Sequence, residues 1–298
     1  MNIKTLLRIA HWTRRFARYR NPVRFKFSRW ALNLLYPAKK RERSECVVVE
    51  YDQGLVHADT ASGLEYGLLF FGYHEPEIVR LIKSVVKPGA VCLDIGANVG
   101  AHTLVMAFAA GPRGRVIAVE PHPELSARLM ENLALNNLKH VTLVRAAVSE
   151  EDGLAAFYTY DNGAFNRGMS SLKPSEQSQR PIQVRTISGR TLQEESNLTA
   201  CDLIKIDVEG YEMVVLRELA DLIGRTRPYL IFEYRRPHWE RCGQAIEEAI
   251  ELLEKLNYKM YCVKHEIIRP TGRAIPDRCD LFCIPMPHAK VDFGMGMA

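Results

Sequence analysis

The sequence predicts an open α/β fold: a mostly parallel sheet of about seven strands with helices on both faces. Three observations lead to this prediction. Short apolar runs alternate with helical segments between residues 91 and 256. The early strands are continuously apolar, as expected when both faces of a strand are covered. The last two predicted strands, 258–264 and 280–285, have no helical segment between them, which favours an antiparallel hairpin at the edge of the sheet.

Composition is that of an ordinary soluble globular protein, but the charge is unevenly distributed. Of the 298 residues, 47% are apolar and 25% are charged, and the formal charge is +5. Residues 1–45 carry 13 Lys and Arg against two Glu, which leaves −6 for the remainder. Apolar residues at helical spacing in this extension predict short amphipathic helices with basic faces. They either pack on the main domain or attach to an anionic surface, membrane phospholipid or nucleic acid.

The main domain is expected at 46–298 and begins with a small lead-in at 46–75. Alternating segments at 46–50 and 64–71 favour short antiparallel strands. Pro76 then opens an amphipathic segment that predicts a helix at 76–86.

The remaining elements follow from the alternation. Strands are predicted at 91–95, 115–120, 141–148, 202–208, 229–234, 258–264 and 280–285, with helices at 100–110, 123–136, 211–223 and 244–256. Residues 149–190 are long for a connection and predict a lid over the substrate. Side chains of Tyr158, Tyr160, Phe165 and Asn166 suit stacking on a sugar ring, although 154–160 can instead form an edge strand.

Cysteine usage and hydropathy indicate the compartment. The seven cysteines are an odd number and lie mostly in apolar runs, so reduced thiols in a cytosolic setting are expected. Cys279 and Cys283 have no second pair at zinc-ligand spacing, and no metal ligand is assigned. No apolar run approaches the roughly 18 residues of a membrane span, and no signal-type stretch opens the chain. We expect a cytoplasmic protein, with peripheral attachment to the inner face of a membrane left open.

The turn at 94–103, DIGANVGAHT, lies where open parallel sheets bind their ligands. Gly96 and Gly100 lack the middle glycine of a dinucleotide fingerprint, and no lysine follows as in a phosphate-binding loop. Glu120 ends the next strand, where a carboxylate can accept ribose hydroxyls. The turn therefore favours a nucleoside with a cationic or zwitterionic tail in place of pyrophosphate. S-adenosylmethionine has these properties.

Seven motifs extend this pattern along the chain. They are GYHEPEIVRLI at 72–82, LDIGANVGAHT at 93–103, AVEPHPELSARLMENLALN at 118–136, RAAVSEEDG at 145–153, MSSL at 169–172, DLIKIDVEGYEMVVL at 202–216 and PYLIFE at 228–233. This ordered set resembles the FkbM family of S-adenosylmethionine-dependent methyltransferases, within the Rossmann-like class. The resemblance covers roughly 64–285. One departure is Gln193, where the family often has Asp.

The resemblance implies a set of cofactor-binding residues. They are Glu75, Asp94, Gly96, Asn98, Gly100, Thr103 and Glu120, with Glu120 at the ribose. Asn98 and Thr103 can instead cap the helix after the turn, and Glu75 can be a carboxylate at a helix start.

Methyl transfer to a hydroxyl requires that the acceptor be positioned and its proton removed. The catalytic candidates lie at the ends of the fourth and fifth strands: Asp207, Glu209, Glu233 and His238. They suit a general base or a divalent-cation site that lowers the pKa of the acceptor. Alternatively, Glu209 is a helix N-terminal carboxylate and His238 a solvated loop histidine.

We expect O-methylation of a hydroxyl on a small molecule, glycan or glycolipid, because the resembling family mostly does so. One alternative is an RNA methyltransferase guided by residues 1–45, although the chain has neither an N-P-P-Y segment nor a catalytic cysteine beside proline. Another is a non-enzymatic, membrane-attached interaction protein with a methyltransferase shell. The glycine spacing disfavours an NAD-dependent oxidoreductase.

Overall fold

A computed structural model of the chain describes residues 8–9, 12–13, 46–60, 62–159, 170–174, 181–264, 267–270 and 275–287. The chain forms two compact units. The first is Met1–His74 with Tyr160–Gly168, and the second is Glu75–Thr159 with Met169–Ala298. Most of the basic extension lies outside the described residues, so its helices and its membrane or nucleic-acid contacts stay sequence predictions.

Between residues 46 and 74, the first unit forms an antiparallel hairpin followed by a helix. The segment predicted at 46–50 forms β1 (Cys46–Tyr51), but its antiparallel partner is β2 (Gly54–Asp59), a strand that was not predicted. The strand predicted at 64–71 is wrong, because these residues form α3 (Gly63–Phe71). Ser62 accepts a hydrogen bond from the Glu65 amide, and the Glu65 carboxylate accepts one from the Asp59 amide. This Ser-x-x-Glu pattern is a helix-start signal that outweighs the apparent alternation.

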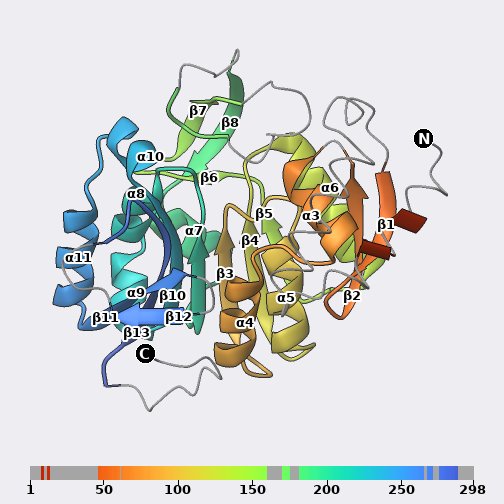
Figure 1. Cartoon of the computed structure of the whole chain (residues 1–298). Helices are drawn as coiled ribbons and strands as arrows, with labels where there is room; N and C mark the ends of the chain where they lie inside the picture. Colours follow the sequence, from red (N-terminus) through yellow and green to blue (C-terminus); the bar gives the residue numbers. More distant parts are fainter. Residues whose placement is uncertain are drawn as a thin grey trace. The chain divides into compact units, whose positions relative to one another are not determined.

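The second unit is built on an eight-stranded sheet in the order β12-β11-β13-β10-β9-β3-β4-β5 (Figure 1). Its strands are β3 (Val91–Ile95), β4 (Arg115–Val119), β5 (Val141–Val144), β9 (Leu203–Ile206), β10 (Tyr229–Arg235), β11 (Tyr258–Lys264), β12 (Ile267–Pro270) and β13 (Arg278–Pro285). The pairs from β10 to β5 are parallel, whereas β13 is antiparallel to β10 and β11. The predicted fold class is confirmed, and β12 adds a short edge strand.

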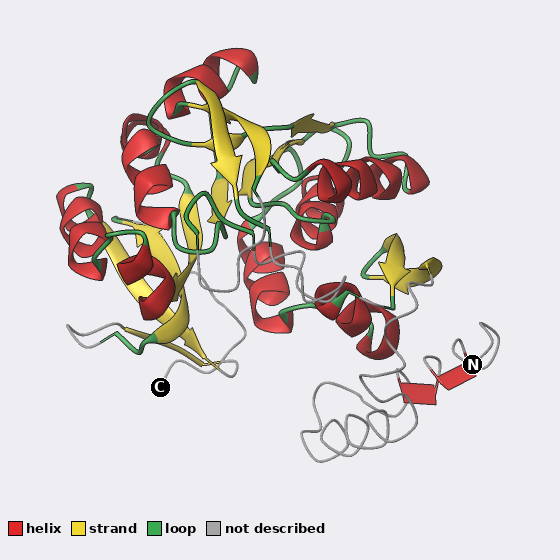
Figure 2. Cartoon of the chain, turned by 90° about the horizontal axis from the view of Figure 1, so that it is seen from above, coloured by secondary structure: helices red, strands yellow, loops and turns green. Residues whose placement is uncertain are grey.

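Helices flank this sheet on both sides (Figure 2). They are α4 (Pro76–Val85), α5 (Ala101–Ala110), α6 (Pro123–Leu135), α7 (Gly189–Glu195), α8 (Glu212–Glu218), α9 (Ala220–Thr226), α10 (Arg236–Arg241) and α11 (Ile246–Lys255). The single helix predicted at 211–223 is wrong, because Leu219 separates α8 from α9. The short helices α7 and α10 were not predicted. Pro237 lies in the first turn of α10, where a missing amide hydrogen costs nothing.

The two faces of the central strands differ in chemistry. Leu93 of β3 and Ile204 of β9 are buried in a cluster with residues of α7, α8, α9 and α11. Because alternate side chains of a strand point to opposite faces, Asp94 and Lys205 lie on the other face. Thr103 of α5 donates a hydrogen bond to Asp94 there. The polar residues of the sheet therefore lie on the side of α5.

The strand predicted at 141–148 is interrupted. β5 ends at Val144, and β6 (Ala147–Val148) pairs with β8 (Ile182–Ile187) in a separate three-stranded sheet with β7 (Gly153–Phe157). This small sheet occupies much of the segment predicted to be a lid, and it bears out the alternative of an edge strand for part of it. The intervening residues 160–169, including Tyr160, Phe165 and Asn166, lie outside the described residues, and the lid stays a prediction.

All seven cysteines are free thiols, and five of them are buried. Among the described helices, none combines the length and apolarity that crossing a membrane requires.

Candidate active site

Strand register brings five ionisable groups onto one face of the sheet, near the carboxyl ends of the parallel strands. Asp94 of β3 lies opposite Lys205 of β9. The register of β9 with β10 puts Asp207 beside Glu233, and Glu233 lies opposite Asp280 of antiparallel β13. Paired residues in a sheet point to the same side. The sequence alone identified three of these groups; Lys205 and Asp280 were missed.

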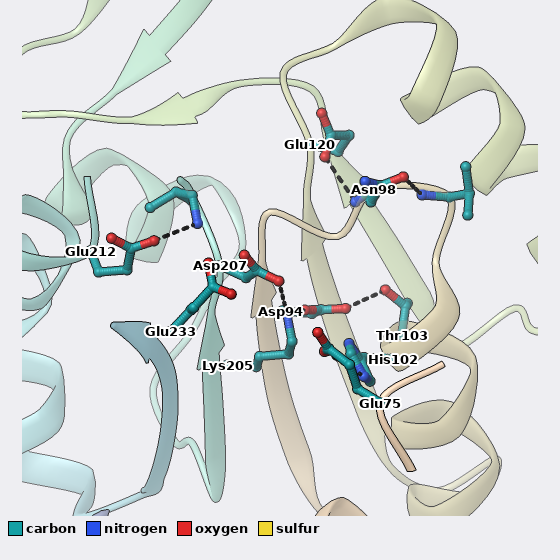
Figure 3. Close-up of polar contacts among 12 residues, drawn as sticks. Glu75, Asp94, Asn98, His102, Thr103, Glu120, Lys205, Asp207, Glu212 and Glu233 are labelled. Atoms are coloured by element: carbon teal, nitrogen blue, oxygen red, sulfur yellow. Dashed lines mark hydrogen bonds and ion pairs between the residues drawn. The ribbon is translucent and has the colours of Figure 1, made fainter. Parts of the chain in front are cut away.

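Lys205 is the cation at the centre of this row (Figure 3). Its Nζ lies 3.2 Å from Asp207 Oδ2 and 4.0 Å from Asp94 Oδ1, and its side chain is only 5% exposed. Burial lowers the pKa of Lys205, but the carboxylates of Asp207 and Asp94 outweigh burial and raise it above its ordinary value. One ammonium group is thus the counter-ion of two carboxylates. The sequence feature that could have identified Lys205 is a lysine inside the otherwise apolar strand segment LIKI.

Asp94 is fully buried, and its two oxygens differ. Oδ2 accepts a hydrogen bond of 2.6 Å from the Thr103 hydroxyl. Oδ1 has no hydrogen-bond donor within the described part of the chain. Burial raises the pKa of Asp94, while Lys205 and Thr103 oppose that rise. Thr103 therefore positions Asp94 rather than capping the helix that contains it.

The turn between β3 and α5 is packed against the end of β9. The amides of Gly96 and Ala97 donate to the Val119 carbonyl of β4. Gly96 has a φ of +80°, and a Cβ added to it would lie 1.8 Å from the Asp207 carbonyl oxygen. Only glycine permits this approach. The turn and the chain after β9 are thereby held in contact.

The second half of the turn is also sterically constrained. Asn98 has a φ of +53°, and its Oδ1 accepts a hydrogen bond from the Val99 amide. Gly100, the N-cap of α5, has a φ of +92°, and an added Cβ would lie 2.3 Å from Leu129 Cδ1. No side chain caps α5. The alternative of Asn98 as a helix cap is therefore wrong.

Glu120 fastens this turn to the end of β4. Oε2 accepts from the Asn98 amide and Oε1 from the His122 amide, each at 2.8 Å. Burial raises the pKa of Glu120 to about 7, although both amides act to lower it. A carboxylate has about four acceptor positions. The described residues fill two of these positions.

Glu75 is the N-cap residue of α4, with a φ of +41° and no capping hydrogen bond from its side chain. Its Oε2 lies 3.6 Å from Nε2 of His102 in α5. Figure 3 draws both side chains below Asp94, and Glu75 also acts to raise the pKa of Lys205. Glu75 therefore lies at the start of a helix, as its alternative interpretation expected, and its place in the cofactor-binding set stays a prediction.

A second group of side chains gathers beside Asp207. Nδ1 of His238 in α10 lies 2.9 Å from Oε2 of Glu209, and Nη2 of Arg235 lies 2.6 Å from Oε1 of Glu233. One ligand-type atom from each of Glu209, Glu233 and His238 lies within 4.8 Å of the others. Burial raises the pKa of Glu233 to about 9, with further contributions from Asp207 and Glu209. All four catalytic candidates therefore lie in one neighbourhood.

Glu212 is a structural carboxylate that sequence analysis did not identify. It is 1% exposed and accepts hydrogen bonds from the amides of Val208 and Gly210. Burial raises the pKa of Glu212 to about 8. Its role is to hold the turn that carries Glu209. Gln193, the family departure, lies on α7 and bonds to the Gly189 carbonyl and to Arg225.

The sequence model described as "Methyltransferase FkbM domain" matches residues 94–260. The hexuronic acid methyltransferase AglP of Haloferax volcanii is 28% identical over 149 residues, which are 50% of this chain and 58% of that protein. The 2-O-methyltransferase NoeI of Sinorhizobium fredii is 26% identical over 167 residues, 52% of this chain and 67% of that one. This chain thus spans little more than half the length of the first relative.

A solved structure of methyltransferase FkbM from Methylobacillus flagellatus is 15% identical, covers 74% of this chain and 52% of its own, and has a TM-score of 0.44. At so low a score, the fold is judged from the chain's own strand order.

The buried lysine generates a prediction about stability. Lys205→Met leaves two carboxylates without their cation, and we expect a loss of about 3–5 kcal/mol in the free energy of unfolding at neutral pH. The carboxylates would then hold protons in the folded state at pH values where the unfolded chain releases them, so the deficit should grow as the pH rises. Urea unfolding at pH 5 and pH 8 measures this, with the exposed Lys259→Met as control. A loss of stability that is the same at both pH values would contradict the role of Lys205 as the counter-ion of Asp94 and Asp207.

Gly96 generates a second prediction, with a matched control in the same chain. Gly89 has a φ of +93° and nothing within 4 Å of an added Cβ, so Gly89→Ala incurs only the left-handed strain of roughly 1–2 kcal/mol. Gly96→Ala adds the collision with the Asp207 carbonyl and should lose at least about 1–3 kcal/mol more. Urea midpoints of the two variants give the comparison. Equal midpoints would show that the turn can move away from β9.

Proposed function

The chain belongs to the FkbM methyltransferase family, and from that membership we propose that it is an S-adenosylmethionine-dependent O-methyltransferase. The observation that carries the proposal is the turn anchored by Asp94 and Glu120 at the ends of β3 and β4. This turn presents carboxylates together with backbone that a ligand can approach closely. It contains no lysine that would bind a pyrophosphate. The proposed acceptor is a hydroxyl of a small molecule, glycan or glycolipid.

The residues of the turn fit the donor. The two acceptor positions of Glu120 that the described residues leave open match a pair of ribose hydroxyls. Asp94 Oδ1, buried and without a hydrogen bond among the described residues, suits a cationic tail. Gly96 and Gly100 present backbone without side chains, and Asn98, Thr103 and Glu75 complete the proposed cofactor-binding set.

S-adenosylmethionine supplies a methyl carbon on a sulfonium centre. The acceptor oxygen attacks that carbon, the carbon–sulfur bond breaks with its electron pair on sulfur, and the hydroxyl proton leaves to a nearby base. The chain contributes by aligning acceptor and donor and by receiving the proton. We assign these tasks to Asp207, Glu209, Glu233 and His238, which lie beside Asp94 across Lys205.

The acceptor class rests on the relatives. Two of them are named for hexuronic acid and 2-O-methylation, and hydroxyl groups are the acceptors those names indicate. Tyr158, which exchanges backbone hydrogen bonds with Ser171, lies on the segment proposed as a lid. The Ser171 hydroxyl also donates to the Glu209 carbonyl. This link connects the proposed lid to the proposed catalytic residues.

Glu120→Gln tests the donor site. The substitution keeps the shape but removes charge and one acceptor oxygen, so affinity for S-adenosylmethionine should fall about tenfold to a hundredfold. Calorimetric titration of the wild type, Glu120→Gln and the exposed Glu131→Gln measures the effect, and urea unfolding checks that each variant is folded. Glu131→Gln should bind like the wild type. Absence of binding by the wild type would refute the proposed function.

The acceptor class is tested with labelled S-adenosylmethionine. The purified protein is incubated with cell extract separated into glycan, lipid, small-molecule and RNA fractions. We expect label in the small-molecule, glycan or lipid fraction, since the relatives are named for sugar and hydroxyl methylation. Label confined to RNA would overturn the acceptor class while leaving methyl transfer intact.

A further inference from the structure

Three side chains converge beside Asp207 from three different elements. Glu209 comes from the turn after β9, Glu233 from β10 and His238 from α10. One carboxylate oxygen or imidazole nitrogen of each lies within 4.8 Å of the other two. Two metal–ligand bonds of about 2.1–2.2 Å span at most about 4.4 Å. Shifts of a few tenths of an ångström would therefore bring all three atoms onto one ion.

The closest pair has the geometry of neighbouring ligands. His238 Nδ1 and Glu209 Oε2 are 2.9 Å apart, the distance of an ion pair when His238 is protonated, and neither atom has another partner among the described residues. Both atoms are buried, and the Glu209 side chain is only 10% exposed. Two ligands at right angles on one ion would be about 3.0 Å apart, given bonds of about 2.1 Å.

The backbone holds Glu209 in this position. Its φ of +56° is unusual for a side chain of this size. The Glu209 carbonyl accepts hydrogen bonds from Arg241 and from Ser171, and the next residue, Gly210, has no room for a Cβ beside the His238 carbonyl. The Glu209 carboxylate is thus presented to His238 by fixed main chain.

Charge around these side chains also favours a cation. Glu233 lies opposite Asp280 on antiparallel strands, a position where like charges destabilise. The nearby cations Lys205 and Arg235 already pair with Asp207 and Glu233. A cation bound here would offset the repulsion between the facing carboxylates of Glu233 and Asp280.

We propose that Glu209, Glu233 and His238 bind one divalent cation. Two carboxylates and one imidazole suit Mn²⁺ or Zn²⁺ better than Mg²⁺, which prefers oxygen ligands. Three protein ligands leave coordination positions open. This inference deepens the proposed function and rests on it in one respect: the open positions would take the acceptor hydroxyl, whose pKa the ion lowers. The released proton then passes to Asp207, which is not a ligand.

Metal binding is tested on the full chain, with no acceptor needed. After treatment with a chelator and its removal, Mn²⁺ is added and the free ion is followed by electron paramagnetic resonance. We expect one Mn²⁺ per chain, displaced by Zn²⁺. Glu209→Gln and His238→Gln should each weaken binding at least about tenfold. Glu240→Gln, an exposed change on the same helix α10, should bind like the wild type.

Two further readouts separate the outcomes. Mn²⁺ should raise the midpoint of thermal unfolding of the wild type, which does not depend on any variant folding. S-adenosylmethionine binding is measured in parallel: donor binding without Mn²⁺ binding would overturn this inference and leave the proposed function standing. Equal Mn²⁺ affinity in the wild type, Glu209→Gln and His238→Gln would also overturn it. Mn²⁺ binding without donor binding would support the ion site and refute the methyltransferase proposal.

Discussion

The arrangement of the candidate site depends on one buried ammonium group. Lys205 lies on a central strand between Asp94 and Asp207, and both carboxylates would be costly in this location without it. Asp94 belongs to the proposed donor side and Asp207 to the proposed acceptor side. A single cation therefore links the two halves of the site at the middle of the sheet.

The residues that hold the turn in place are also the residues proposed to bind the ligand. Glu120 accepts two main-chain amides, and the described residues leave its other acceptor positions open, so the turn is fixed before any donor arrives. Gly96 touches the main chain at Asp207, which couples the turn to the neighbouring strand. Such preorganisation reduces the ordering that a ligand would otherwise have to impose.

The fold could be predicted because parallel strands buried on both faces have a clear apolar signature. Two predicted elements were wrong for local reasons. At 64–71 the helix-start signal of Ser62 and Glu65 outweighed the apparent strand alternation. The strand predicted at 141–148 ends at Val144 because the following residues pair in another sheet. The turn residues were accessible through their motif. Lys205 and Asp280 were missed because their partners are set by strand register, and Glu212 was missed although it bonds the turn directly before it. Register depends on contacts distant in sequence, and periodicity does not encode it.

The position of β13 has a consequence for how the chain is made. This strand, the last to leave the ribosome among those described, lies between β10 and β11, which are synthesised earlier. Until β13 has emerged, one edge of β10 is unpaired and β11 has no strand through which to join the sheet. Asp280 is also not yet beside Glu233. An unpaired apolar edge invites association with other chains. Formation of β13 therefore closes this edge and brings Asp280 beside Glu233 in the same step.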